Sequence, residues 1–222
     1  LWQQISSTII SEIYADSAYD GVVLDTEHGS FSNENLYASI QIITLKRKNC
    51  FVRVSHLDKS LVRMCLDAGA TGIIFSTVEN KLQAREIIDY CIYPIDGGRR
   101  GQGLVRENFW GKDRLQERMP ILIAQIETKE AVDNIDDLYN MPFDYYLVGP
   151  YDLSADLGCV AEWDNEEYKK YLEKINIIPK ELRGVHLVKN NDIKSHDLSG
   201  YGFYALGMDT TMLIDSINNL DK

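Results

Sequence analysis

Short apolar runs alternate with helical patterns along the whole chain, and this alternation constrains the fold more than any other feature of the sequence. The runs cover residues 21–25, 51–54, 72–76, 121–127, 145–149, 184–188 and 202–207. Between them, apolar residues recur at the spacings of three and four that are typical of helices. The clearest series is Ile5, Ile9, Ile10 and Ile13. Near-continuous apolar strands separated by helices predict a parallel sheet with both faces covered.

Two architectures combine parallel strands with helices in this way, the (β/α)8 TIM barrel and the doubly wound open sheet. Residues 1–3 provide the remnant of an eighth strand, so the 222 residues supply eight β/α units. A doubly wound sheet normally has a Gly-rich phosphate turn after its first strand. Here the first clear strand runs instead into the acidic sequence Asp-Thr-Glu-His at 25–28. We therefore predict an α/β fold with a single (β/α)8 barrel domain over residues 1–222.

The chain is acidic, with 34 Asp and Glu against 23 Lys and Arg and a formal net charge of -11. Such a chain repels phosphate backbones and anionic lipids, which argues against nucleic-acid or membrane-surface functions. No apolar run approaches the ~18 residues of a membrane span, and the cysteines are scattered without metal-ligand spacing. These features favour a cytoplasmic protein with reduced thiols. An anionic substrate would need positive charge concentrated locally, by a few arginines or a metal ion.

Polar residues at the carboxyl ends of the strands are the candidates for catalysis, because barrel active sites form there. They are Asp25, His28, Arg53, Glu127 and Asp152, with Gln125 and His186 inside strands. His28 is separated from Arg53 by 25 positions, and Glu127 from Asp152 by the same number. This separation is about one βα unit, so the partners should lie at the same end of neighbouring strands.

Glu127 and Asp152 would place two carboxylates against one small volume. Like charges so placed cannot both stay ionised unless a cation lies between them. Mg²⁺ and Mn²⁺ are often held by one or two carboxylates, with water and substrate oxygens completing the shell. The alternative is that each carboxylate caps the helix that follows it. Capping explains either residue alone, whereas the matched positions of the two favour a metal site.

Arg53 lies between two valines in a strand that should be buried, so its guanidinium needs an anionic or carbonyl partner. Two roles remain open: an internal ion pair, for example with Asp25, or an electrophile aimed at a substrate oxygen. Asp25 also precedes His28 by three residues. A carboxylate that accepts from one ring nitrogen makes the other a general base, whereas a solvated loop histidine is the alternative for His28.

Two glycine-containing segments have different interpretations. Residues 149–154 (GPYDLS) run from a strand into a helix, whose first backbone N–H groups and dipole can receive a substrate carboxylate. Residues 97–103 (GGRRGQG) lack both the preceding strand and the following GK[ST] of a nucleotide loop. We predict that 97–103 is a mobile loop whose Arg99 and Arg100 meet an anionic substrate tail.

Seven motifs occur in order along the chain. They are DTEHG (25–29), FVRV (51–54), LDAGATGII (66–74), YPIDGGRRGQG (93–103), QIET (125–128), GPYDLSADLG (149–158) and GMDTTML (207–213). Together they resemble the HpcH/HpaI aldolase family, which is related to the citrate lyase β-subunit. The resemblance implies a TIM barrel of the pyruvate/phosphoenolpyruvate superfamily type and a metal-dependent class II aldolase that acts on 2-oxo acids.

The resemblance also implies roles for individual residues. Glu127 and Asp152 match the metal ligands of the family, for Mg²⁺, Mn²⁺ or Co²⁺. His28 and Asp25 match its proton-transfer pair, and Arg53 matches its strand arginine. The substrate-binding residues that it implies are Gln125, Gly149, Pro150, Tyr151 and Asp152, with the carboxylate on the amides of the last two. A homohexamer is implied as well, and the family's first helix is missing before Leu1.

The expected reaction is reversible cleavage of a 4-hydroxy-2-oxo acid, derived from a sugar acid or a dioic acid, into pyruvate or a similar 2-oxo acid and an aldehyde. Three alternatives remain: a citrate-synthase-like or citrate-lyase-like enzyme on the same barrel, a Schiff-base aldolase using Lys189, and a non-catalytic barrel module. The chain departs from the family pattern at Ser55-His56, at Ser76 and within 93–103. These positions concern the aldehyde side, so the aldehyde stays unassigned.

Overall fold

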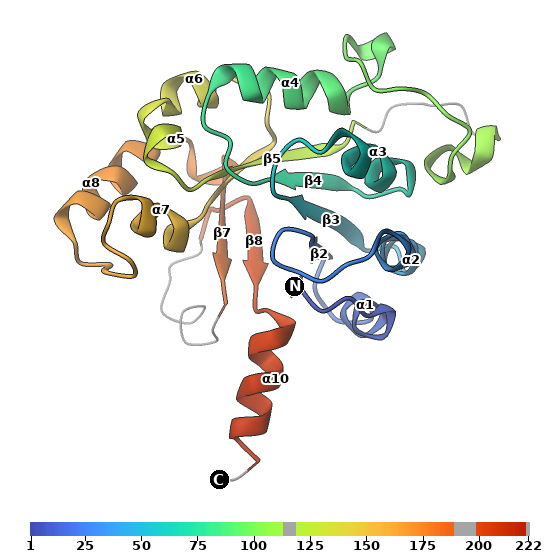
Figure 1. Cartoon of the computed structure of the whole chain (residues 1–222), viewed down its shortest axis with the longest axis horizontal. Coiled ribbons are helices and arrows are strands. Elements are labelled where there is room, and N and C mark those ends of the chain that lie inside the picture. Colours follow the sequence, from blue (N-terminus) through green and yellow to red (C-terminus); the bar gives the residue numbers. More distant parts are fainter. Residues whose placement is uncertain (113–118, 189–198, 221–222) are drawn as a thin grey trace.

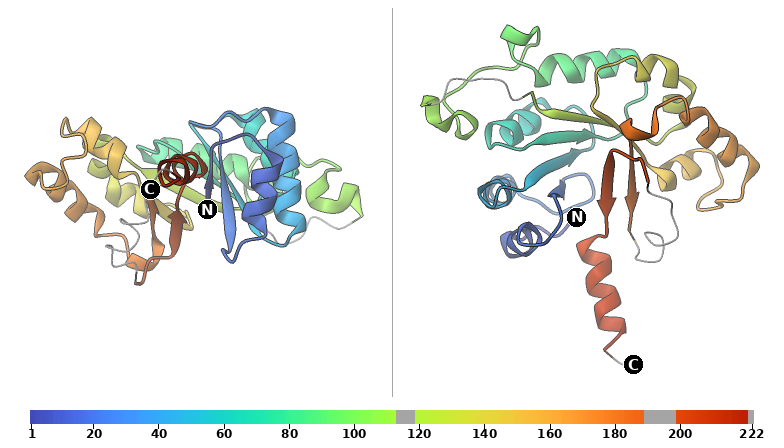
Figure 2. Two further views of the ribbon diagram at one scale, coloured as in Figure 1. Left: turned by 90° about the horizontal axis from the view of Figure 1, so that it is seen from below. Right: turned by 180° about the vertical axis from the view of Figure 1, so that it is seen from behind.

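The computed structural model describes residues 1–112, 119–188 and 199–220. In these residues the chain forms one eight-stranded sheet in which each strand pairs in parallel with the next strand in sequence. The sheet curls into a nearly closed barrel with helices around its outside (Figure 1, Figure 2). The predicted (β/α)8 barrel is confirmed, including the short first strand formed by Trp2 and Gln3.

The strands follow the predicted apolar runs closely. They are β1 (Trp2–Gln3), β2 (Gly21–Asp25), β3 (Asn49–Val54), β4 (Gly72–Phe75), β5 (Ile121–Ile126), β6 (Tyr145–Val148), β7 (Arg183–Leu187) and β8 (Phe203–Leu206). The α-helices are α1 (Thr8–Ala15), α2 (Asn33–Leu45), α3 (Lys59–Asp67), α4 (Lys81–Cys91), α5 (Lys129–Asp133), α6 (Ile135–Tyr139), α7 (Pro150–Asp156), α8 (Glu166–Ile175) and α10 (Asp209–Asn218). Short 3₁₀ helices are η1 (Pro94–Asp96), η2 (Arg106–Gly111) and η3 (Lys180–Leu182).

Local sequence sets several helix boundaries. The side chain of Ser32 accepts a backbone N–H from the first turn of α2, and that of Asp58 accepts two from the first turn of α3. Such caps satisfy N–H groups that have no partner within the helix. Gly69, with a φ of +94°, follows α3 and turns the chain where a side chain would be strained. Because α2 and α3 begin and end at defined residues, the connections are short, and β3 pairs directly with β4.

Alternation along the strands creates two apolar cores. The barrel interior is filled by Trp2, Val23, Phe51, Ile74, Ile123, Leu147 and Ala205. Outward-facing residues such as Val22, Leu24 and Val52 pack against the helices. Asp25 and Arg53 share the inward face two residues beyond this interior layer, and they are register partners in the β2–β3 pairing. The fold therefore places an acidic–basic pair at the carboxyl end of the barrel.

The apolar series that predicted α1 does not form its buried face. Ile9 and Ile13 are 69% and 62% exposed, whereas the buried residues of α1 are Ser11, Tyr14 and Ala15. The series therefore predicted the helix correctly, but its most apolar positions are not the ones that the barrel covers. Sequence spacing shows that one face is apolar, but it does not show whether the barrel covers that face.

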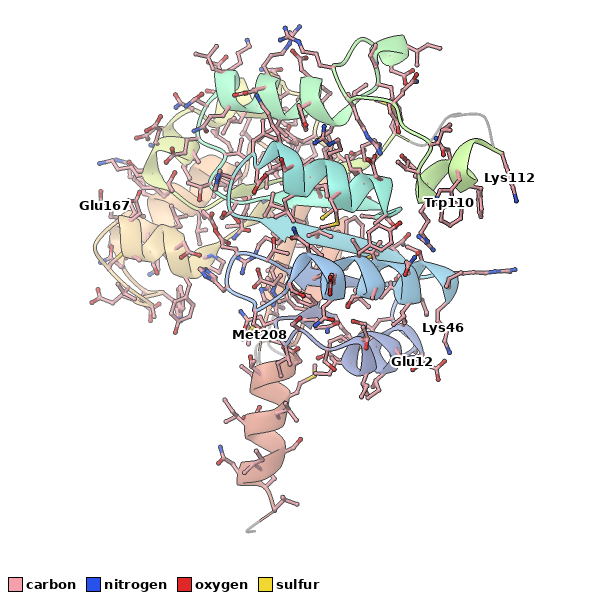
Figure 3. All side chains as sticks on the ribbon, turned by 45° about the vertical axis from the view of Figure 1, so that its right-hand side comes forward. Glu12, Lys46, Trp110, Lys112, Glu167 and Met208 are labelled. Atoms are coloured by element: carbon pink, nitrogen blue, oxygen red, sulfur yellow. The ribbon has the colours of Figure 1, made fainter. Side chains whose placement is uncertain are left out.

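α10 also leaves apolar side chains uncovered. It begins after Met208 and projects away from the barrel in two opposite views (Figure 1, Figure 2), and the side chains toward its C-terminal end extend away from the rest of the protein (Figure 3). Leu213, Ile214 and Ile217 are 50%, 56% and 61% exposed. Among the described residues, no helix has the length and apolar character needed to cross a membrane.

Candidate active site

The polar side chains predicted at the strand ends gather at the carboxyl end of the barrel. A cavity of about 240 Å³ lies there, lined by Glu27, His28, Thr77, Glu127, Thr128 and Asp152. Arg53 contacts Glu27 of this lining, and Gln125 contacts Glu127, both from buried positions. The structure therefore brings the candidate residues of β2, β3, β5 and the turn after β6 into one site.

A second cavity, of about 520 Å³, lies at the opposite end of the barrel, among the strand beginnings. Its lining is dominated by apolar and aromatic side chains, including Phe51, Tyr145 and Phe203. In TIM barrels the active site forms at the carboxyl ends of the strands. The smaller cavity, where charged groups converge, is therefore the candidate active site.

Arg53 is held from several sides. Its Nε donates to Asp25 Oδ1 at 2.9 Å and its Nη2 to Asp25 Oδ2 at 2.6 Å, while Nη1 lies 2.9 Å from Glu27 Oε2. Its Cζ lies 4.8 Å from the ring centroid of Trp2. Burial disfavours the charge, but the hydrogen bond and charge of Asp25, followed by Glu27 and Glu127, hold the pKa of Arg53 above its ordinary value. The ion pair anticipated with Asp25 is present.

Asp25 does not orient the His28 ring, contrary to the prediction from their spacing. Its Oδ1 accepts from Arg53 and from the backbone N–H groups of Glu27 and His28, at 3.1 and 3.3 Å for the two amides. Its Oδ2 accepts from Arg53 and from the Trp2 indole. The buried guanidinium takes both carboxylate oxygens, as a bidentate pair does, so the imidazole lies elsewhere. His28 Nε2 is 3.9 Å from Glu27 Oε2, and its side chain is 61% exposed.

Glu127 is an acid with a strongly shifted pKa. Its Oε1 accepts from the Thr77 N–H at 2.7 Å and from Thr77 Oγ1 at 2.8 Å, and its Oε2 accepts from the side-chain amide of Gln125. Burial raises the pKa of Glu127 to about 7; hydrogen bonds from Thr77 oppose the shift, and the charges of Asp152 and Glu27 add to it. A bound cation would favour the ionised form of a carboxyl in these surroundings.

Neither Glu127 nor Asp152 caps a helix. The side chain of Thr128 caps α5, because it accepts a backbone N–H of that helix. Gly149 occupies the N-cap position of α7, and Asp152 lies inside the first turn. The capping alternative is therefore wrong for both carboxylates, which instead line the same cavity.

The donor set fits a hard divalent cation completed by water and substrate oxygens. The buried Oε1 of Gln125, whose amide nitrogen contacts Glu127, has no hydrogen-bond partner. An unpartnered buried oxygen calls for a donor or a cation. Within residues 1–112, 119–188 and 199–220, no three His, Cys, Asp or Glu side chains group so as to hold a metal. Two carboxylates with water and substrate suit Mg²⁺ or Mn²⁺, whereas structural zinc needs four protein ligands.

The first turn of α7 borders the cavity through Asp152. No side chain caps this helix at Gly149, so the first N–H groups, those of Tyr151 and Asp152, are not served by a capping oxygen. Pro150 has no N–H to satisfy, and its fixed φ suits the first helical position. The side chain of Tyr151 is 64% exposed, so a substrate role for this residue would come from its backbone.

Gly149 has no side chain, and this allows the turn before α7 to lie close to the Glu127 carboxylate. A Cβ at this position would lie 2.8 Å from Glu127 Oε2 and 3.0 Å from Gln125 Nε2. We expect Gly149→Ala to displace the Glu127 carboxylate and to weaken Mn²⁺ binding at least about tenfold, as for other changes beside metal ligands. Gly101→Ala is the matched control, because a Cβ there meets nothing within 4 Å. Equal Mn²⁺ affinity of Gly149→Ala and wild type in a calorimetric titration would contradict this role.

His186, a weaker candidate for the site, packs within the barrel against Trp2. The two ring centroids are 4.2 Å apart with an interplanar angle of 16°, and His186 Nε2 lies 3.3 Å from the Gly207 carbonyl oxygen. Burial lowers the pKa of His186 to about 4; the Gly207 carbonyl opposes the shift and Arg53 adds to it. The neutral ring therefore supports Trp2, whose indole donates to Asp25 at 3.2 Å.

The prediction for Arg100 is wrong. Its side chain is 1% exposed and donates to Asp67 at 2.9 Å and to Glu107, so it holds the segment after α4 against α3 and is not free to meet a substrate. The side chain of Arg99 is 81% exposed. Lys189, the Schiff-base alternative, lies outside the described residues.

Among the site residues that escaped the sequence-based prediction are Glu27, Ser76 and Thr77. Ser76 Oγ donates to Glu27 Oε2 at 2.8 Å, and Thr77 binds Glu127 as described above. All three follow the carboxyl ends of β2 or β4. The criterion that selected Asp25 and Glu127 would have selected them too, had it been applied to every polar residue at a strand end.

Comparison with known proteins shows which proteins this chain is similar to. The family model described as HpcH/HpaI aldolase/citrate lyase matches residues 1–216. The 2-keto-3-deoxy-L-rhamnonate aldolase of Shigella sonnei is 29% identical, over 98% of this chain and 85% of that protein. An HpcH/HpaI aldolase/citrate lyase family protein from Burkholderia cenocepacia has a TM-score of 0.90 at 24% identity, covering 99% of this chain and 91% of that one. The citrate synthase SbnG has a TM-score of 0.84 at 24% identity, covering 99% and 89%.

The two solved structures are below 25% identity and therefore show the fold alone. The family model goes further, because it spans the whole barrel and every residue that lines the cavity. The chain is therefore a member of the HpcH/HpaI aldolase/citrate lyase family, and a carbon–carbon lyase of the aldolase type.

Proposed function

We propose that this protein reversibly cleaves a 4-hydroxy-2-oxo acid into pyruvate, or a similar 2-oxo acid, and an aldehyde, with Mg²⁺, Mn²⁺ or Co²⁺ held by Glu127 and Asp152. One observation carries the proposal. Glu127 and Asp152 line the same cavity, and the buried Arg53, which is paired with Asp25, contacts Glu27 of that lining. The substrate in the name of the Shigella sonnei relative belongs to this chemical class.

The cavity offers separate contacts to each end of a 2-oxo acid. When bound, the metal would supply Lewis-acid activation of the keto oxygen. The substrate carboxylate would accept hydrogen bonds from the N–H groups of Tyr151 and Asp152, at the positive end of α7. Gln125, whose side-chain amide nitrogen donates one N–H to Glu127, would use its other N–H to help hold the same end of the substrate.

Arg53 would stabilise the enolate oxygen that develops as the C3–C4 bond breaks. A guanidinium carries five N–H groups. Contacts with Asp25 and Glu27 involve Nε, Nη1 and Nη2 once each, so N–H groups remain for a substrate. Because the two carboxylates already fix the guanidinium, little reorganisation is needed during the reaction. Asp25 would therefore act through Arg53.

His28 would move the proton. Its ring is exposed at the cavity, beside Glu27, and would take the proton of the C4 hydroxyl directly or through one water. A neutral imidazole accepts the C4 hydroxyl proton during cleavage, and the imidazolium would then give it to C3 of the enolate, which forms pyruvate and restores the neutral ring. Glu27, rather than Asp25, is the carboxylate nearest to the ring and would stabilise the imidazolium.

Chelation tests the metal dependence. We expect EDTA to abolish pyruvate release from a 4-hydroxy-2-oxo acid, and Mg²⁺, Mn²⁺ or Co²⁺ to restore it, because Glu127 and Asp152 repel each other without a cation. Undiminished release in the chelator would contradict the proposal. Two parallel assays separate the alternatives: citrate formed from oxaloacetate and acetyl-CoA would indicate a citrate synthase, and a borohydride-trapped pyruvate adduct would indicate a Schiff-base aldolase.

We also propose that the protein is a homo-oligomer, with the hexamer as the number that the family resemblance implies. The exposed apolar residues of α10 and α1 support this proposal, because monomers rarely leave so much apolar surface uncovered. Changing Ile214 and Ile217 to Asp should reduce the mass measured by light scattering, whereas Glu166→Gln, an exposed polar change on α8, should not. A wild-type mass of 25.3 kDa would contradict it.

A further inference from the structure

Thr77 is held in a backbone conformation that few β-branched residues adopt. It lies two residues after Phe75, the last residue of β4, and its φ is +55°. Branching at Cβ makes this left-handed conformation unfavourable. Residues kept in such conformations cluster at functional sites, where the surroundings hold them in place. Here the surroundings include Glu127, which binds both the N–H and the hydroxyl of Thr77.

The conformation has a clear structural consequence. Successive side chains of a strand point to opposite faces, so a regular extension of β4 would send the hydroxyls of Ser76 and Thr77 apart. Instead, Ser76 donates to Glu27 and Thr77 donates to Glu127, each at 2.8 Å. Two consecutive hydroxyls thus reach the carboxylate on the arginine side of the cavity and the carboxylate on the metal side.

The two carboxylate oxygens of Glu127 differ in how many hydrogen bonds they accept. A carboxylate has about four acceptor sites, two on each oxygen. Thr77 occupies both sites of Oε1, through its N–H at 2.7 Å and its Oγ1 at 2.8 Å. Oε2 accepts from Gln125 and keeps one site. The oxygen with a free acceptor site is therefore Oε2.

From this arrangement we infer that Thr77 is a positioning residue for the metal site, which fixes Glu127 so that it offers Oε2 alone to a divalent cation. The inference rests on the proposed metal-dependent function and adds a determinant of cation affinity to it. A partner that orients a metal ligand commonly changes affinity by about ten- to a hundredfold. Because the Thr77 N–H stays in place when the side chain is changed, the lower end of this range applies.

Four variants test the inference by Mn²⁺ titration of metal-free protein and by thermal unfolding. Thr77→Val keeps the shape and removes the hydroxyl, and Thr77→Ser keeps the hydroxyl. Thr77→Gly removes the hydroxyl and also relieves the left-handed strain. Thr44→Val is the matched control, because its hydroxyl donates to the Ile40 carbonyl within α2, outside the cavity lining.

We expect Thr77→Val and Thr77→Gly to bind Mn²⁺ about tenfold more weakly than wild type, and Thr77→Ser and Thr44→Val to bind it as wild type does. Thr77→Gly should unfold at a midpoint no lower than that of wild type, so weaker binding would not reflect a weaker fold. Equal affinity across the series, or affinities that simply follow the unfolding midpoints, would overturn the inference while leaving the proposed function intact. Absence of Mn²⁺ binding by wild type would overturn both.

Discussion

Replacing Glu127 by Gln should lower the kcat for cleavage of a 4-hydroxy-2-oxo acid by about a thousandfold, because a Lewis-acid metal contributes several kcal/mol to such a step. Gln has the same shape but no negative charge, so Asp152 alone would remain to bind the cation. The substitution should not lower the stability of the fold. Burial raises the pKa of Glu127 to about 7, which means that folding already disfavours its charged form. The unfolding midpoint of metal-free Glu127→Gln should therefore match or exceed that of wild type.

The control is Glu130→Gln, the same change on an exposed side chain three residues later in α5. It should leave kcat, Mn²⁺ affinity and the unfolding midpoint unchanged. Steady-state kinetics at saturating Mg²⁺ and calorimetric Mn²⁺ titration measure the difference. A Glu127→Gln enzyme with wild-type kcat, or one that still binds Mn²⁺ with wild-type affinity, would show that the cation is held elsewhere.

Replacing Asp25 by Asn should destabilise the fold by about 3 kcal/mol, because breaking one side of a buried ion pair leaves the other charge poorly compensated. Arg53 is 7% exposed and Asp25 is fully buried, and their two hydrogen bonds are 2.9 and 2.6 Å long. For a chain of this size the unfolding midpoint should fall by roughly 6–12 °C. Asp16→Asn, which breaks an exposed pair with Lys46, should leave the midpoint unchanged.

The pH dependence of this difference has a defined sign. Burial alone would raise the pKa of Asp25, but the hydrogen bond and charge of Arg53, with Trp2 and Gln4, hold it below the ordinary value. A lowered folded-state pKa contributes stability that is present above the unfolded value of about 3.9 and is lost as pH falls through the lower folded value. The stability gap between wild type and Asp25→Asn should therefore shrink below about pH 4. Urea unfolding at neutral and acid pH measures it, and a gap that widens on acidification would contradict the assignment.

Much of the fold could be predicted because the strands of a parallel barrel are buried on both faces and therefore form apolar runs in the sequence. The same runs placed Asp25 and Arg53 at neighbouring strand ends, where they are register partners. Spacing also brought Glu127 and Asp152 to one cavity. These successes share a cause: when the fold is a barrel, position along a strand decides which end and which face a residue occupies.

The partner of each side chain could not be predicted in the same way. Spacing linked Asp25 to His28, but a buried guanidinium competes for the same carboxylate and binds both of its oxygens. Arg100 looked available because its segment is rich in glycine, yet Asp67 and Glu107 bind it. In both cases the outcome depends on which charge is buried, and burial is a property of the assembled fold.

Thr77 shows a different limit. No sequence pattern marks a threonine that will adopt a φ of +55°, because the conformation is imposed by contacts with Glu127 and not by local preference. The exposed isoleucines of α1 show a third limit. Their spacing indicates an apolar face, but whether the barrel or another molecule covers it depends on surfaces outside the helix.

The most direct measurement is an anomalous difference map from crystals of the wild-type protein soaked with Mn²⁺ and pyruvate. We predict one strong peak coordinated by the Glu127 and Asp152 carboxylates, with the pyruvate carboxylate at the first N–H groups of α7 and its keto oxygen within reach of Arg53. A map with no peak between these two acids, or with pyruvate bound away from them, would contradict it.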